Sequence, residues 1–227
     1  MTKRLEELSK SLDRSKQHDL QGAAALVKKC ATAKFDETVE LHIRLGIDPK
    51  QSDQQVRGTI NLPHGTGKTK RVAVLAKGEK QKEAQAAKAE AVGADDLIER
   101  ISKGFMDFDV LVATPDIMRE VTKLGKILGP RGLMPNPKSG TVTFDIAKIV
   151  QELKTGRVEF KADDSGIVHL AIGKASFPEA HIAENARTIL EAITKAKPAA
   201  SKGTYIKSIS LCSTMGPAVA VDATQKY

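Results

Sequence analysis

The chain has 227 residues, of which 41% are hydrophobic and 28% charged, and a formal net charge of +8 at pH 7. This length can bury a substantial core in one or two domains, and the basic excess is consistent with a polyanionic partner. Because no apolar run reaches the ~18–20 residues that span a bilayer, and the polar N-terminus lacks a signal-peptide core, we expect a cytoplasmic protein without membrane contact.

The first part of the chain predicts one helix and two strands. Residues 20–33 carry apolar side chains at helical spacing, with Asp19 placed to cap the helix. Residues 38–46 alternate between apolar and polar side chains, which predicts a strand with one wet face. Residues 56–62 predict a second strand.

From residue 67 the pattern changes to buried strands separated by helices. Residues 71–76 and 109–116 are nearly continuous apolar runs, typical of buried parallel strands. Helices are predicted over 77–94, 95–102 and 117–128. The alternation of strand and helix predicts a parallel sheet built from βαβ units.

After residue 158 the alternating pattern returns. Residues 158–173 predict a hairpin with its turn at Asp163–Gly166, and residues 181–196 predict an amphipathic helix. The last strands are predicted over 204–214 and 218–222.

These elements predict a mixed α/β and α+β fold with two domains. A discontinuous α+β domain, 1–66 plus 159–227, is interrupted by an inserted three-layer, Rossmann-like α/β domain, 67–158. The chain would cross between them twice, near the PHGTGK turn and near 154–157, and two such crossings predict a hinge.

The two cysteines and five histidines predict no special chemistry. Cys30 and Cys212 form no C-x-x-C pair, and the histidines show neither i, i+4 spacing nor a nearby cysteine cluster. We therefore expect reduced core cysteines rather than a disulfide, no metal site and no cofactor.

The segment HGTGKTK at 64–70 and Asp116 raise the alternative of a P-loop-like nucleotide-binding α/β enzyme. The P-loop pattern needs a glycine five places before Gly67, where this chain has Leu62, and a strand follows the glycines instead of a helix. We favour a hinge for this segment. For Asp116 we favour a helix cap, because no nucleophile and base stand near it in a catalytic pattern.

Three strings carry a family resemblance. Residues 126–137, KILGPRGLMPNP, contain so many glycines and prolines that they predict neither a helix nor a central strand. With TMGP at 214–217 and KFDETVE at 34–40, this loop makes the chain closely similar to the L-one family of large-subunit ribosomal proteins. The resemblance covers all but about the first twenty residues.

The resemblance implies a split two-domain protein with no enzymatic activity, acting as a monomer within the ribosome. It implies binding to the stalk helices of large-subunit rRNA, contact with deacylated tRNA leaving the exit site, and repression of translation of its own mRNA. It also implies rRNA contacts at seven positions: Lys34, Phe35, Thr38, Thr214, Met215, Gly216 and Pro217. From the residues alone, Phe35 would be a core residue and TMGP a β-turn between strands.

Further RNA candidates come from residue chemistry. Hydroxyls on one strand face can bond ribose and phosphate oxygens, and lysine neutralises phosphate. Ser176 has an alternative role in a capping box with Glu179, and for Arg131 a rigid turn is favoured over RNA or tRNA contact. The candidates are His169, Lys174, Ser176, Lys207, Ser208 and Ser210, with Arg131 as the weaker one.

Charge does not single out the RNA-binding domain. The predicted split domain carries 19 basic and 16 acidic side chains, and the inserted domain 17 and 12. Because aromatic residues make up only 4% of the chain, we expect recognition of RNA shape and sugars rather than base stacking.

Overall fold

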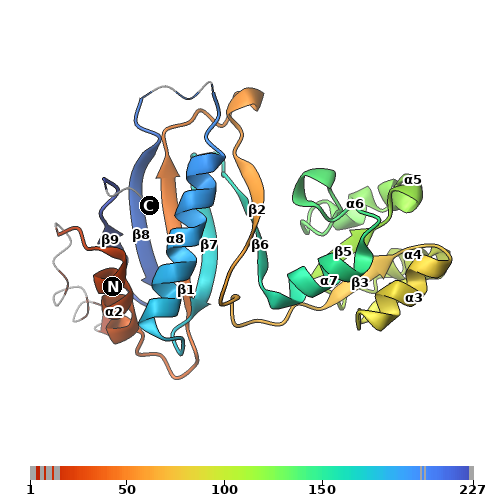
Figure 1. The fold of residues 1–227 in the computed structure, drawn as a ribbon, viewed down its shortest axis with the longest axis horizontal. Helices are drawn as coiled ribbons and strands as arrows, with labels where there is room; N and C mark the ends of the chain where they lie inside the picture. Colours follow the sequence, from red (N-terminus) through yellow and green to blue (C-terminus); the bar gives the residue numbers. More distant parts are fainter. Residues whose placement is uncertain are drawn as a thin grey trace. The chain divides into compact units, whose positions relative to one another are not determined.

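The computed structural model describes residues 4, 5, 8, 12, 16–199, 201 and 203–224 (Figure 1). The chain divides into two compact units, residues 1–67 with 158–227 and residues 68–157, and each is described here on its own. Among the described residues, no helix combines the length and the apolar character that crossing a membrane requires.

An antiparallel four-stranded sheet forms the centre of the first unit. Its strand order is β7-β1-β8-β9, with β1 (Thr38–Leu45) between β7 (Ile167–Lys174) and β8 (Ile206–Ser213), and with β9 (Val219–Val221) at one edge. The predicted alternation of β1 is confirmed, because Val39, Leu41, Ile43 and Leu45 are all buried.

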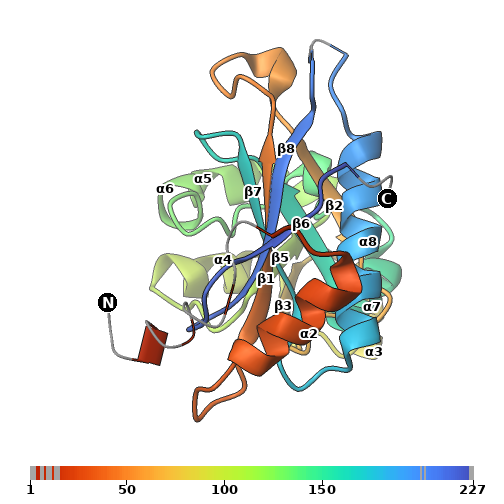
Figure 2. The same cartoon turned by 90° about the vertical axis from the view of Figure 1, so that its left-hand side faces the viewer.

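Two helices cover one face of this sheet (Figure 2). Helix α2 (Leu20–Cys30) begins at Asp19, whose carboxylate accepts a hydrogen bond from the Gly22 N–H at 3.2 Å, so the predicted cap is confirmed. Helix α8 (Glu179–Lys195) buries the predicted apolar stripe against the sheet. The opposite face of the sheet, where the polar side chains of β1 point, carries neither helix.

The predicted hairpin over 158–173 is only partly correct. The turn is where the sequence placed it, with the Asp163 carboxylate accepting N–H bonds from Ser165 and Ile167. However, β6 (Arg157–Lys161) pairs with β2 (Arg57–Asn61) in a separate two-stranded sheet, and a single bridge, Ala162 to Val168, joins its end to β7. The strands therefore diverge after one residue pair.

The second unit is a parallel sheet between two layers of helices. Its strand order is β4-β3-β5, formed by β3 (Val72–Leu75), β4 (Ala91–Gly93) and β5 (Val110–Ala113). One face packs on α3 (Glu79–Ala86) and α7 (Ile146–Thr155). The other packs on α4 (Asp95–Ser102), α5 (Met118–Lys123) and α6 (Gly125–Leu128).

Three predictions in this unit are wrong. The helix expected over 77–94 ends at Ala86, and the short strand β4 follows it. The helix expected over 117–128 is broken into α5 and α6, with a turn of 3-10 helix at Pro115–Ile117 before them. Asp116 lies inside that 3-10 turn, and no side chain caps the turn or α5.

The glycine- and proline-rich loop is held by its own backbone. Helix α6 extends into it as far as Leu128, and the Leu133 N–H returns to the Leu128 carbonyl at 3.0 Å. Gly132 adopts a φ of +69°, a left-handed conformation that glycine takes without strain. The Asn136 N–H then bonds the Thr141 hydroxyl at 2.8 Å. These bonds support the predicted rigid turn.

Candidate nucleic-acid interface

Most residues of the KFDETVE and TMGP strings meet at one end of the four-stranded sheet. Strand β1 begins there at Thr38, which is the register partner of Lys174 at the end of β7, and β8 ends there beside Val39. We call Asp36, Thr38, Lys174, Ser176 and Thr214 the Thr38 cluster.

Thr214 joins β8 to β1 through its backbone and its side chain. Its hydroxyl accepts the Thr38 N–H at 3.0 Å and lies 3.2 Å from the Thr38 carbonyl, to which it can donate. Its own N–H bonds the same carbonyl at 3.0 Å. The hydroxyl expected to contact RNA therefore holds the two strands together.

Lys174 holds the end of the sheet together through hydrogen bonds and also carries a positive charge. Its ammonium group donates to the Thr38 hydroxyl at 3.0 Å and to the Asp36 carbonyl at 3.3 Å. Both acceptors are neutral oxygens, so neither cancels the positive charge. Lys174 thus holds a fixed cation at the sheet end, where a phosphate group could meet it.

Ser176 does not form the predicted capping box. Helix α8 begins after Pro178, with no side-chain cap. Instead, the Ser176 hydroxyl donates to Asp36 Oδ2 at 2.9 Å, and its N–H donates to Asp36 Oδ1 at 3.1 Å. The helix begins two residues later than the capping box with Ser176 would place it, and Ser176 bonds Asp36 instead.

A buried carboxylate, Glu37, fixes the TMGP turn. Its side chain accepts the N–H groups of Ala33 and Met215, each at 2.9 Å. Burial raises the pKa of this carboxyl, but the two backbone hydrogen bonds, together with the Ser213 side chain and the charge of Arg4, outweigh burial and hold the pKa below its usual range. Glu37 is therefore ionised at neutral pH and joins the two strings.

Two apolar side chains stand out of the surface on the segments that Glu37 joins. Phe35 is 55% exposed and Met215 is 49% exposed, so the reading of Phe35 as a core residue is wrong. Arg4 donates to the Met215 carbonyl at 2.8 Å, which adds a cation beside the turn. Exposed apolar groups beside cations are suited to the sugar and base faces of RNA.

The remaining TMGP residues have local structural roles. The Gly216 N–H bonds the Ser213 carbonyl at 3.0 Å, and a Cβ on Gly216 would collide with the Ser213 hydroxyl. The turn therefore requires glycine, and Pro217 is buried behind it. Lys34, in contrast, is exposed.

Other predicted site residues lie along the sheet, away from the Thr38 cluster. Ser208 pairs with Arg44, six residues and about 20 Å along β1 from Thr38, and exposed Lys207 lies at the register shift beside it. Ser210 and His169 are both register partners of His42. Arg131 is exposed in the second unit.

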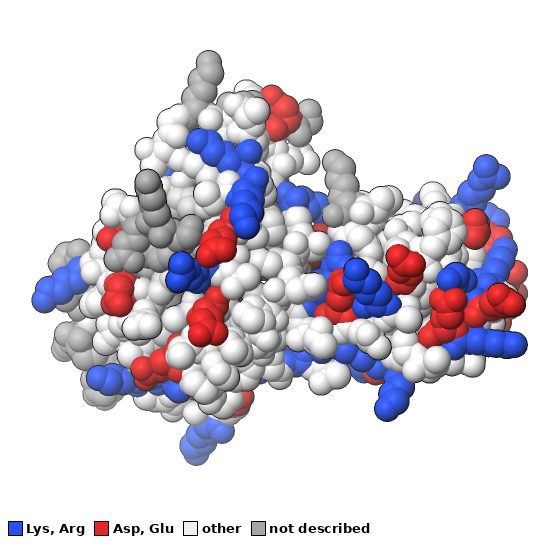
Figure 3. Space-filling model, viewed as in Figure 1, with Lys and Arg blue, Asp and Glu red and all other residues white. Residues whose placement is uncertain are grey.

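Charge does not mark the interface by itself. On the side of the molecule drawn in Figure 3, basic and acidic side chains are intermixed over both units. This agrees with the sequence, in which both predicted domains carry a modest basic excess.

The glycine segment at 64–70 has no phosphate-binding geometry. Gly65 and Gly67 have φ values of +64° and +74°, and strand β3 follows them instead of a helix. Asn185 of α8 donates to the Gly65 carbonyl at 3.0 Å and accepts the His64 N–H at 3.3 Å. His64 and Gly65 therefore form a turn that is fixed to α8.

The sequence did not reveal Asp36 and Glu37 as organising residues, although both lie inside the KFDETVE string. Two adjacent carboxylates immediately before a strand were the available signal. The sequence also does not indicate that Glu40, His42 and Cys212 come together, because Cys212 is far from the other two along the chain. Burial lowers the pKa of His42, and nearby His169 lowers it further.

Comparison with known families identifies the chain's family. A family model described as the ribosomal protein L1p/L10e family matches residues 27–217, which include β1, β8, and the KFDETVE and TMGP strings.

Proposed function

The chain belongs to the ribosomal protein L1p/L10e family, and on that premise we propose which of its surfaces holds RNA. Membership makes it a protein of the large ribosomal subunit that binds rRNA and works on the ribosome in the cytoplasm. Proteins of this family are structural rather than enzymatic.

The proposed rRNA surface is the Thr38 cluster together with Phe35 and Met215. The observation that carries it is the buried Glu37 carboxylate, which fixes the segment bearing Met215 against the segment bearing Phe35. A surface that is rigid before binding loses little conformational entropy when RNA docks. The exposed side chains of Phe35 and Met215 then offer sugar packing, and the Lys174 ammonium group at the same end of the sheet offers phosphate attraction.

This arrangement suits a folded RNA better than a single strand. The Thr38 cluster presents hydroxyl, carbonyl, carboxylate and ammonium groups on a fixed frame, and the neighbouring Phe35 adds one aromatic ring. Stacking of successive bases would need several such rings. Recognition would instead read backbone shape and 2′-hydroxyl groups.

We further propose that the RNA is the stalk region of large-subunit rRNA, that the protein assists release of deacylated tRNA, and that it represses its own message. The family resemblance supports all three. If one surface recognises both the stalk rRNA and the protein's own mRNA, a stalk rRNA fragment should displace that mRNA from the protein. For tRNA, ribosomes lacking the protein should release exit-site tRNA more slowly.

We also propose that the two compact units are separate domains, with the RNA surface on the discontinuous one. Every residue of the Thr38 cluster belongs to that unit. If so, residues 1–67 and 158–227, joined by a short glycine linker, would fold and bind rRNA without the inserted unit.

A photo-cross-linking experiment tests the surface directly. A photoreactive amino acid would replace Met215 in one protein and Met134 in another, since both methionines are exposed and Met134 belongs to the other unit. In assembled ribosomes, we expect position 215 to cross-link to large-subunit rRNA in high yield. Equal or lower yield at 215 than at 134 would contradict the proposal.

A further inference from the structure

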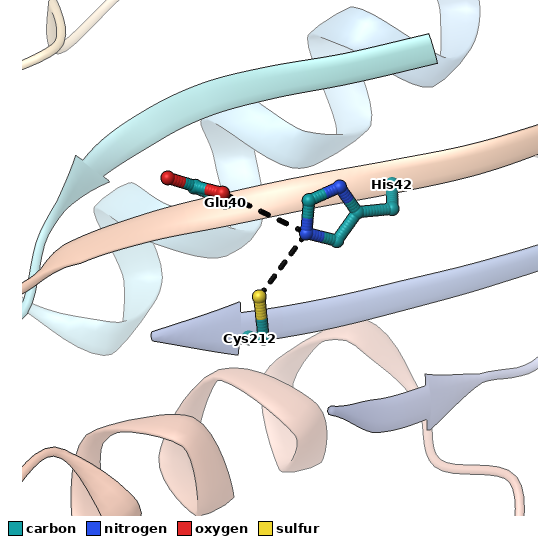
Figure 4. Close-up of side chains that lie close together, drawn as sticks. All are labelled: Glu40, His42 and Cys212. Atoms are coloured by element: carbon teal, nitrogen blue, oxygen red, sulfur yellow. Dashed lines mark hydrogen bonds and ion pairs between the residues drawn. The ribbon is translucent and has the colours of Figure 1, made fainter. Parts of the chain in front are cut away.

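Three side chains able to bind metal meet on the face of the four-stranded sheet opposite helices α2 and α8. Glu40 and His42 are two residues apart on β1 and so point to the same face, and Cys212 on β8 is the register partner of Glu40 (Figure 4). His42 Nε2 lies 3.1 Å from Cys212 Sγ and 3.7 Å from Glu40 Oε2. All three ligand atoms lie within 4.8 Å of one another.

We propose that Glu40, His42 and Cys212 bind a zinc ion. Carboxylate oxygen, imidazole nitrogen and thiolate sulfur are the donors zinc takes in proteins, at about 2.0–2.3 Å, which separates neighbouring tetrahedral ligand atoms by about 3.4–3.6 Å. The observed separations of 3.1 and 3.7 Å lie on either side of this value. Small side-chain rotations would therefore complete the geometry, and solvent would take the fourth position.

A hydrogen-bonded chain behind His42 supports the assignment. His42 Nδ1 lies 2.7 Å from Nδ1 of His169, and His169 Nε2 lies 3.5 Å from the Asp163 carboxylate. If His169 keeps its proton on Nε2 for Asp163, its Nδ1 accepts from His42 Nδ1–H. His42 Nε2 is then left with a free lone pair, directed at the proposed metal position. Metal-binding histidines usually have such an outer partner, which fixes the ring and its tautomer.

The donor set decides between classes of metal. Magnesium and calcium prefer sites made of oxygen, whereas a sulfur and an imidazole favour zinc and later transition metals. The strands β1 and β8 are hydrogen-bonded along this stretch, so the backbone already holds the ligands in place. The side chains of His42 and Glu40 are 23% and 41% exposed, which leaves the site open to solvent.

The proposed zinc site shares no residue with the Thr38 cluster, so RNA-free protein can test it. Full-length, untagged protein would be titrated with Co²⁺, followed by the thiolate-to-cobalt absorption band, and then with Zn²⁺ by competition. We expect one Co²⁺ per chain with a thiolate band that zinc abolishes. Cys212→Ser should remove the band, and His42→Ala should weaken zinc binding by about 100-fold or more. His169→Ala should weaken it by roughly 10–100-fold, as for an outer partner.

Two control variants match these changes. Cys30→Ala removes the other cysteine, which is the buried last residue of α2, and His181→Ala removes a histidine outside the cluster. Both should bind metal as the unchanged protein does. In Cys30→Ala, zinc should also protect Cys212 from alkylation, which mass spectrometry measures without altering any ligand.

Three results would overturn the proposal. They are the absence of a thiolate band in the unchanged protein, zinc affinity unaltered in both Cys212→Ser and His42→Ala, and no zinc protection of Cys212 from alkylation. If Cys212→Ser fails to fold, the alkylation result and Glu40→Gln decide the question.

Discussion

At the scale of single residues, the buried carboxylate of Glu37 organises the candidate RNA surface. It accepts two backbone N–H groups from segments far apart in sequence, Ala33 and Met215. A carboxylate with two such donors is difficult to replace, because an amide turns its own N–H groups toward at least one of them. Thr214 and Lys174, the residues expected to touch RNA directly, depend on the frame that Glu37 fixes.

We predict that Glu37→Gln lowers the free energy of unfolding by about 1–3 kcal/mol at pH 7, the usual cost of leaving a buried donor unpaired. The pKa of Glu37 in the folded protein is below its ordinary value of 4.5, so the ionised carboxylate stabilises the fold above that pH. This stabilisation is lost as pH falls through the lowered pKa. The difference between the two proteins, measured by urea unfolding, should therefore shrink below pH 4.5.

Glu191→Gln is the matched control for this prediction. Glu191 lies on the exposed side of α8, paired with Arg187, and should change stability by no more than about 0.5 kcal/mol. A Glu37→Gln protein as stable as this control at pH 7 would show that the carboxylate does not hold the turn.

At the scale of elements, helix α3 shows where sequence patterns fail. Its alanine-rich sequence predicts helix as far as Gly93, but Lys88 adopts a φ of +59° and the Ala89 N–H turns back to the Ala84 carbonyl. Neither glycine nor proline marks this stop. The chain leaves the helix because Ala91, Val92 and Gly93 pair with β3, a contact distant in sequence.

We predict that Lys88→Gly stabilises the protein by about 0.5–1 kcal/mol, because glycine adopts the left-handed conformation without the strain of a side chain. The side chain of Lys88 is exposed, so little packing is lost. Lys82→Gly, inside the same helix, is the control with opposite sign and should destabilise by about 1 kcal/mol. Thermal unfolding measures both, and a stability loss in Lys88→Gly would contradict the assigned backbone.

The difference between local sequence patterns and contacts distant in sequence explains how much of the fold could be predicted. Strand β1, the buried strands β3 and β5, and the stripe of α8 follow from local periodicity, and the structure confirms them. The β2–β6 pair, β4 and the break between α5 and α6 depend on distant partners, which periodicity does not reveal. At the site, the KFDETVE and TMGP strings indicate Thr38 and Thr214. They do not reveal the hydrogen bond between these two residues. The sequence pairs Ser176 with Glu179 in a capping box. Its partner in the structure is Asp36, which lies on a segment distant in sequence.

At the scale of the whole molecule, net charge is a poor guide to function. Basic and acidic residues are nearly balanced in both parts of the chain. We therefore propose that attraction of RNA to one surface depends on a few fixed cations, such as Lys174, combined with exposed apolar groups. The proposed RNA surface is thus marked by the Thr38 cluster with its exposed neighbours Phe35 and Met215, rather than by a basic patch.

The most direct test of this account is the affinity of a stalk rRNA fragment for Met215→Ala, compared with the unchanged protein and with Met134→Ala at one salt concentration. Met215 and Met134 are both exposed, at 49% and 37%, and neither substitution removes a backbone hydrogen bond. We predict binding about tenfold weaker or more for Met215→Ala, equivalent to about 1.4 kcal/mol, and no change for Met134→Ala. Binding by Met215→Ala as tight as that of the unchanged protein would contradict the assignment of RNA binding to this surface.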